Sequence, residues 1–529
     1  MEANLKFSVA AEGVSEQDNA IIRHVLCTSV LLPAPHWTEH ALSMKLNTMK
    51  SKILLGVLAG FGISAAHALE LGQLTFKSCE IGKGLSLTKA ECSYLSVPQN
   101  YAAPDGVKLK VHIALIASSA RKPQADPAVY LAGGPGQSAS ESFGQIAPGF
   151  REILKTRHLL LIDQRGTGLS HALKCKMPED VSLATPDETT MRSMVRDCLK
   201  AQDLDPQFFT TTDATKDLES LRVAIAAPQL NLVGFSYGTR VAQQFAMHYP
   251  NSTRSLILDG VAPNQLILGS EHAQALDEAL AKQFARCAAD KACFARFGDP
   301  AQTLKQLVAD LTANPREIEI SDPLTGKPSK LPLGIGALQG MARFYAYASE
   351  TAALVPILMD EAKQGRPQTM LAQSEMAGKN LGDAMSHGMQ LSVLCSEDNE
   401  FLKADLSNKD RLLGNEMQEM LKLQCQEWPK GGRPKDFFEP LTGNIPTLLI
   451  SGEFDPVTPA RYGDLVLKGL SNAQHIIVPA QGHINLGRGC IPKLAGEFMV
   501  GLTPKLLKTE CVQKISPAPF FLELTGPAP

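Results

Sequence analysis

The stretch "LNLVGFSYGTRVAQQFAMHYP" (residues 230–250) decides the fold that we predict for this chain. It opens with a mostly apolar run typical of a buried strand and continues with apolar residues at helical spacing. Ser236 lies at the junction between Gly234 and Gly238, where a β-carbon in place of either glycine would crowd a tight turn. Such a turn exposes a serine hydroxyl at the carboxyl edge of a sheet, so we expect Ser236 to be a nucleophile.

Further strand-like runs occur on both sides of this stretch. Residues 107–116 alternate in polarity like a half-exposed strand, and the other runs are continuously apolar like buried parallel strands. These continuous runs cover residues 128–132, 158–163, 255–260, 447–452 and 475–479. Because helical patterns separate them, the sequence predicts an α/β fold with a mostly parallel, doubly wound sheet.

The pattern becomes mostly helical after the run that ends at Gly260 and stays so until about Asn444. We interpret this part as a helical cap lobe inserted into the sheet domain. The expected organisation is an upstream stretch with a targeting segment (1–68), the first part of the core (69–265), the cap lobe (266–440) and the C-terminal part of the core (441–529).

Length and composition exclude several classes of protein. The chain has 529 residues, of which 44% are hydrophobic, so it can bury a large core. The 51 basic and 54 acidic residues give a net charge of -3, and no basic run interleaved with aromatic residues is present. Nucleic acid is therefore not an expected partner.

A targeting segment is predicted at an unusual position. Lysines at 45, 50 and 52 precede an apolar run over residues 53–66, and "AHA" (residues 66–68) follows it. This order is typical of a secretory signal peptide cleaved after Ala68, and the run is shorter than the ~20 residues of a membrane anchor. The 43 residues before Met44 suggest that translation begins at Met44 or Met49. The mature protein is thus expected to be periplasmic or secreted, without a stable membrane anchor.

Cysteine usage agrees with export. Ten of the 11 cysteines follow the predicted cleavage site, and an even number in an exported chain suggests disulfides. Sequential pairing is the simplest of the possible connectivities, and buried free thiols are the alternative. The neighbouring couples are Cys79 and Cys92, Cys175 and Cys198, Cys287 and Cys293, Cys395 and Cys425, and Cys490 and Cys511.

A serine nucleophile needs a base and a carboxylate that orients this base. His483 follows the last strand-like run in a glycine-flanked loop, which suits the chain order serine, acid, histidine of this fold. Asp455, after the preceding run, is the best-placed acid, with Asp259 and Asp163 as rivals that could instead fix loops. Histidines in or beside strands or on a helix suit structural roles better, namely His112, His158, His248 and His475.

The developing oxyanion needs fixed donors, which are usually backbone N–H groups. Tyr237 follows the nucleophile and supplies one of them. The loop "GGPGQS" (residues 133–138) comes directly after a strand-like run, and we expect the N–H of Gly134 to be the other donor.

These motifs together resemble the proline iminopeptidase and tripeptidyl aminopeptidase family of α/β-hydrolases. The resemblance rests on "GGPGQS", "DQRGTGLS", "GFSYGT", "LDGV", "GEFDPVTP" and "GH", with "CAADKACFARFGD" in the lobe, and spans nearly all of the mature chain. The cysteines make it closer to the exported tripeptidyl branch. The small cytosolic iminopeptidases have a histidine where this chain has Ala132, which weakens the transfer of strict proline specificity.

The resemblance implies a serine aminopeptidase that releases an amino acid or a short peptide from a free N-terminus through an acyl-enzyme. The peptide would be a dipeptide or tripeptide, with proline-containing ones among the candidates. The substrate ammonium then calls for a carboxylate on the lobe. In "LCSEDNEF" (residues 394–401), Glu397 or the neighbouring Asp398 is in the matching position, and we select Glu397 as the substrate-binding residue. A solvated acidic turn is the alternative.

Two other functions stay open at this point. A carboxylesterase would use the same three catalytic residues without the amine-binding carboxylate, and a catalytically inactive hydrolase would serve as a binding module. No cofactor is expected, because "GIGALQG" near Gly334 lacks the preceding strand and spacing of a dinucleotide site. No metal-ligand spacing is present either.

Overall fold

The computed structural model of the chain describes residues 69–175, 187–321 and 326–527. The predicted signal peptide and the stretch before it lie outside the described residues. Within these three ranges, none of the helices combines the length and the apolar character that a membrane crossing requires.

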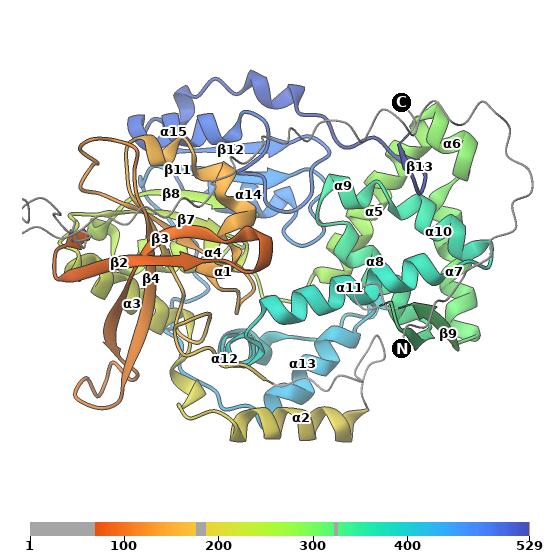
Figure 1. Cartoon of the computed structure of the whole chain (residues 1–529), viewed down its shortest axis with the longest axis horizontal. Helices are drawn as coiled ribbons and strands as arrows, with labels where there is room; N and C mark the ends of the chain where they lie inside the picture. The colour runs from red at the N-terminus through yellow and green to blue at the C-terminus, as the bar shows by residue number, and fades with distance from the viewer. Residues whose placement is uncertain (1–68, 176–186, 322–325, 528–529) are drawn as a thin grey trace, which may run out of the picture. The chain divides into compact units, whose positions relative to one another are not determined.

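The central feature is a ten-stranded sheet with the order β1-β2-β3-β4-β6-β5-β7-β8-β11-β12 (Figure 1). The first four strands form an antiparallel edge, and the other six run parallel to one another. This arrangement confirms the predicted α/β fold. The strands are β1 (Leu69–Leu71), β2 (Leu74–Ile81), β3 (Thr88–Pro98), β4 (Lys108–Ile116), β5 (Ala128–Leu131), β6 (Leu159–Ile162), β7 (Leu230–Phe235), β8 (Thr253–Asp259), β11 (Thr447–Gly452) and β12 (Ala473–Val478).

Helices cover both faces of the sheet, so every residue of β5, β6, β7 and β11 is buried. One apolar cluster joins the sheet to α3 (Thr211–Ala224), α4 (Tyr237–His248) and α14 (Ala460–Leu467). A second cluster joins the other face to α1 (Ala139–Ile146) and α15 (Ile491–Gly501). Burial on both faces explains why these strands are continuous apolar runs in the sequence.

The segment between β8 and β11 forms the mostly helical group beside the sheet in Figure 1. It has an apolar cluster of its own and includes one hairpin that the sequence does not predict, β9 (Arg316–Ser321) with β10 (Pro328–Leu333). The proposed boundaries at 265/266 and 440/441 fall in loops on either side of the helices. These helices are α5 (His272–Ala289), α6 (Lys291–Phe297), α7 (Pro300–Ala313), α8 (Ile335–Tyr345), α9 (Ser349–Ala352), α10 (Val355–Lys363), α11 (Gln368–Ala384), α12 (His387–Glu397) and α13 (Glu416–Glu427).

Five disulfides join the cysteine couples in the sequential order predicted. Two of them belong to one apolar cluster, one in the first part of the core and the other in the lobe. Cys175 is bonded to Cys198 on α2 (Glu188–Lys200), and Cys395 on α12 is bonded to Cys425 on α13. Because α2, α12 and α13 share one apolar cluster, these bonds cross-link the walls around it.

Close backbone packing at the start of α4 leads to a stability prediction. A β-carbon at Gly238 would lie 2.1 Å from the Leu131 carbonyl oxygen, so Gly238→Ala must displace α4 from β5 and should cost about 2 kcal/mol or more. At Gly378, within α11, a β-carbon meets open space, and Gly378→Ala should stabilise the helix by about 0.5–1 kcal/mol. Urea unfolding followed by circular dichroism measures both changes, and similar midpoints for the two variants would contradict this account.

Candidate active site

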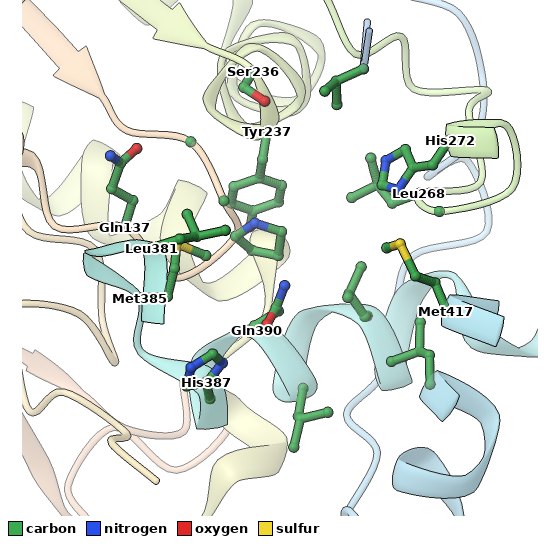
Figure 2. Close-up of a pocket in the computed structure, with 18 of the residues that line it drawn as sticks. Gln137, Ser236, Tyr237, Leu268, His272, Leu381, Met385, His387, Gln390 and Met417 are labelled. Carbon is green, nitrogen blue, oxygen red and sulfur yellow. The ribbon is translucent and has the colours of Figure 1, made fainter. Parts of the chain in front are cut away.

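Ser236 occupies the turn between β7 and α4 with φ 53° and ψ -123°. This backbone conformation is rare for a residue with a β-carbon, and it is typical of serines on strained turns that expose the hydroxyl. A β-carbon at Gly234 would lie 2.5 Å from the Gly238 carbonyl oxygen, which explains both glycines. The turn holds the Ser236 side chain at the wall of a cavity (Figure 2).

The loop after β5 approaches Ser236 closely. A β-carbon at Gly133 would lie 3.1 Å from the Ser236 β-carbon, and Gly134 follows with φ +107°, a value that favours glycine. Gly134 and Tyr237 both line the cavity. Neither of their backbone N–H groups has an acceptor among the described residues. Two donors beside the serine can stabilise a negative oxygen that forms there.

Asp163 holds this loop from behind. Its carboxylate accepts hydrogen bonds from Ser138 Oγ at 2.7 Å, from Ser140 N at 2.9 Å and from Ser140 Oγ at 2.7 Å, and it contacts His112 Nδ1 at 3.0 Å. Burial opposes ionisation, but these hydrogen bonds outweigh it and lower the pKa of Asp163. Asp163 therefore fixes the glycine loop and does not contact His483.

His483 lines the same cavity and is paired with Asp455. The distance from His483 Nδ1 to Asp455 Oδ2 is 2.8 Å, and the backbone N–H groups of Val457 and Thr458 donate to Asp455 Oδ1 at 2.9 and 2.8 Å. Burial alone would lower the pKa of His483, but the charge and hydrogen bond of Asp455 raise it above its ordinary value. This arrangement leaves Nε2 as the nitrogen available to a reacting group. No hydrogen bond between Ser236 and His483 is present in the described part of the chain.

Asp259, the other rival acid, binds the backbone of the histidine loop. Its Oδ2 accepts hydrogen bonds from Asn485 N at 2.7 Å and Leu486 N at 2.6 Å. Burial raises the pKa of Asp259 to about 7 despite these bonds. Asp259 thus positions the residues that follow His483, while Asp455 contacts the imidazole itself.

The cavity that contains Ser236 and His483 has a volume of about 820 Å³. Helix α12 contributes His387, Gln390, Leu391 and Leu394 to its wall, and most other lining side chains are apolar. None of the described lining residues is acidic. In the same part of the chain, no group of three or more histidine, cysteine or acidic side chains could hold a metal ion.

The structure corrects the prediction for Glu397. This side chain is 0% exposed and does not line the cavity, because the part of α12 that faces the cavity ends at Leu394. Glu397 instead accepts hydrogen bonds from Thr211 N at 2.6 Å and Thr211 Oγ1 at 2.8 Å, and Thr211 Oγ1 lies 2.7 Å from the Tyr237 hydroxyl. Burial and the Asp398 charge raise the pKa of Glu397 to about 8. It binds the first residue of α3 and has no exposed surface through which it could contact a substrate ammonium.

Sequence reasoning missed other residues of the cavity wall. Arg343 lies on α8, Tyr347 lies just after this helix, and His272 is the first residue of α5. The Tyr347 carbonyl accepts the His483 N–H at 2.7 Å, and the two rings meet edge to face at 5.4 Å. A single arginine or histidine in helical text has no characteristic spacing, so no signal in the sequence could have selected these residues.

Comparisons with known proteins agree with this architecture. Residues 127–321 match the alpha/beta hydrolase fold family, and residues 410–511 match the TAP-like protein family. The chain is therefore an α/β-hydrolase and an enzyme of the serine hydrolase class.

Individual relatives show which kinds of α/β-hydrolase are similar to this chain. The chain is similar to serine protease Hip1 of Mycobacterium tuberculosis, with 25% identity over 80% of this chain and 87% of that protein. It is also similar to tripeptidyl aminopeptidase of Streptomyces lividans (25% identity over 38% of this chain and 40% of the relative) and to proline iminopeptidase of Xylella fastidiosa (28%, covering 26% and 33%). These matches confirm the resemblance to the tripeptidyl aminopeptidase and proline iminopeptidase group.

The buried ion pair next to Glu397 yields a second stability prediction. Arg240 Nη1 on α4 lies 3.0 Å from Asp398 Oδ2, and both side chains are fully buried. Arg240→Met leaves Asp398 buried without its partner and should destabilise the protein by about 3–5 kcal/mol. Arg366→Met breaks an exposed pair with Glu361 and should hardly change the urea midpoint. A loss no larger than that of the control would show that Asp398 does not depend on Arg240.

Proposed function

We propose that this protein is an exported serine aminopeptidase that releases an amino acid or a short peptide from free N-termini. The observation that carries the proposal is the convergence of four groups in one cavity. They are the side chains of Ser236 and His483 and the N–H groups of Gly134 and Tyr237, which have no acceptor among the described residues. The names of its relatives favour peptide bonds as the target, since they include a tripeptidyl aminopeptidase and a proline iminopeptidase.

The proposed reaction proceeds through an acyl-enzyme. His483 Nε2 removes the proton of Ser236 as its Oγ attacks the scissile carbonyl, and Asp455 holds the imidazole and stabilises its positive charge. The N–H groups of Gly134 and Tyr237 stabilise the negative oxygen that forms. His483 then gives its proton to the departing amine, and a water molecule activated by the same histidine releases the acyl group from Ser236.

Export is part of the proposal. Five disulfides are characteristic of proteins from oxidising compartments, and reducing conditions in the cytosol disfavour them. They agree with the signal peptide that the sequence predicts at residues 45–68.

A carboxylesterase is the second candidate, and one observation favours it. An aminopeptidase needs an anionic partner for the substrate ammonium, yet the described lining residues include no carboxylate. An ester substrate would need none.

Hydrolysis of matched arylamides distinguishes the two candidates. We expect turnover of Pro-, Ala-Ala- or Ala-Ala-Pro-arylamides with a free amine, a loss of at least about tenfold on N-acetylation, and a loss of about 10⁶-fold in Ser236→Ala. Turnover of a short-chain aryl ester alone would support the carboxylesterase, and equal turnover of free and acetylated peptides would contradict an exopeptidase.

The pH dependence tests the role of His483. Because only the neutral imidazole acts as base and Asp455 raises its pKa, kcat/KM should rise with pH through a midpoint above about 6.5. Asp455→Asn removes the charge that opposes the effect of burial, so the midpoint should fall and kcat should drop about 10⁴-fold. A profile of the wild-type enzyme that is flat through neutrality would exclude His483 as the base.

A further inference from the structure

Arg343 is a cation in the cavity wall that has no anionic partner among the described residues. It lies on α8 and is only partly buried, and its Nη1 contacts the sulfur of Met417. It forms no ion pair with any of the described residues. A thioether is a weak acceptor, so most of the guanidinium donors remain available to a molecule in the cavity.

The surroundings of Arg343 increase its attraction for an anion. A guanidinium in a mostly apolar cavity loses part of its hydration free energy. Hydrogen bonds to an anionic partner offset this loss. The neighbouring His272 adds no second positive charge, because burial and the positive charges of Arg343 and His483 lower its pKa to about 3 and keep it neutral. Nδ1 of His272 is buried and has no hydrogen-bond partner in the part of the chain that the structure describes, so a second polar atom is available beside Arg343.

Arg343 lies on the side of the cavity that faces the departing half of a substrate. Tyr347, four residues further on, binds the His483 backbone and contacts its ring. Figure 2 shows His272 and Met417 on one side of the cavity and Gln137 and Met385, from the oxyanion side, on the other. A histidine that protonates the leaving group must lie beside it, so the side with His483, His272 and Arg343 receives the leaving group.

We infer that Arg343 binds a carboxylate on the leaving-group half of the substrate, which rests on the proposed peptidase function. The planar guanidinium fork suits a carboxylate with two parallel hydrogen bonds. A cavity of about 820 Å³ encloses ligands of a few residues, so the substrates are short peptides. The carboxylate is either their C-terminus or an aspartate or glutamate side chain near it.

Calorimetric titration of the Ser236→Ala protein tests this site without turnover. Alanine peptides of three to five residues are compared as free acids and C-terminal amides, and Ala-Ala-Asp-amide is compared with Ala-Ala-Asn-amide. We expect at least about tenfold tighter binding of the acid in one of these pairs, and the pair with the preference identifies the source of the carboxylate.

Variants of Arg343 in the same background assign the preference to this residue. Arg343→Gln should reduce the acid-over-amide ratio to about one, and Arg343→Lys, which keeps the charge, should retain part of it. Arg366→Gln, an exposed arginine outside the cavity wall, should keep the full ratio. Circular dichroism verifies that each variant is folded.

Three outcomes would each overturn the inference. They are equal binding of acids and amides, no binding of any peptide at millimolar concentration, and an acid preference that survives in Arg343→Gln. Failure of the proposed function has a different signature. In that case the enzyme with Ser236 hydrolyses esters but no peptides, while an acid preference that depends on Arg343 persists in the titrations and upholds the carboxylate site.

Discussion

Close backbone contact around Ser236 is the constraint on which the rest of the site depends. Gly133, Gly234 and Gly238 bring three segments together at distances that leave little or no room for a β-carbon. This contact fixes the φ of Ser236 at 53° and sets the Gly134 and Tyr237 N–H groups beside its side chain. The strain at one serine is sustained because buried parallel strands and the packed α4 surround it.

Three carboxylates at the carboxyl edge of the sheet position the other parts of the site, and each binds a different loop or side chain. Asp163 follows β6 and holds the glycine loop, Asp259 ends β8 and holds the backbone after His483, and Asp455 follows β11 and contacts the imidazole. Parallel strands end at the same edge, so loops far apart in the sequence meet there. The end of α12 adds Glu397 and the residue after the helix is Asp398; they connect the inserted lobe to Thr211 and to Arg240 on α4.

The sheet and the serine turn could be predicted because their signals are local. Buried parallel strands read as apolar runs, and the glycines around Ser236 have a steric reason that the sequence displays. The cysteine couples are close enough in sequence for sequential pairing to be the simplest expectation, and the structure has that pairing. The fold and the disulfides are therefore confirmed.

The wrong prediction for Glu397 and the missed cavity residues have a common physical cause. Whether a side chain is buried or lines a cavity depends on the whole fold. By its helical spacing, Glu397 belongs to the same side of α12 as the residues that line the cavity. In the structure Thr211 contacts Glu397 there, and the cavity does not extend beyond Leu394. The same holds for Arg343 and His272, whose proximity to His483 comes from the packing of the lobe. The roles of Ser236, His483, Asp455, Tyr237 and Gly134 in catalysis stay predictions, although the structure brings these residues to one site.

Covalent labelling with a fluorophosphonate tests the central claim most directly, because Ser236 Oγ must displace fluoride with the help of His483. Peptide mapping by mass spectrometry should find one phosphonylated residue, Ser236, and His483→Ala should label at least about 10³-fold more slowly. His248→Ala, an exposed histidine at the end of α4, should label at the wild-type rate. Labelling at another residue, or an undiminished rate in His483→Ala, would contradict the account.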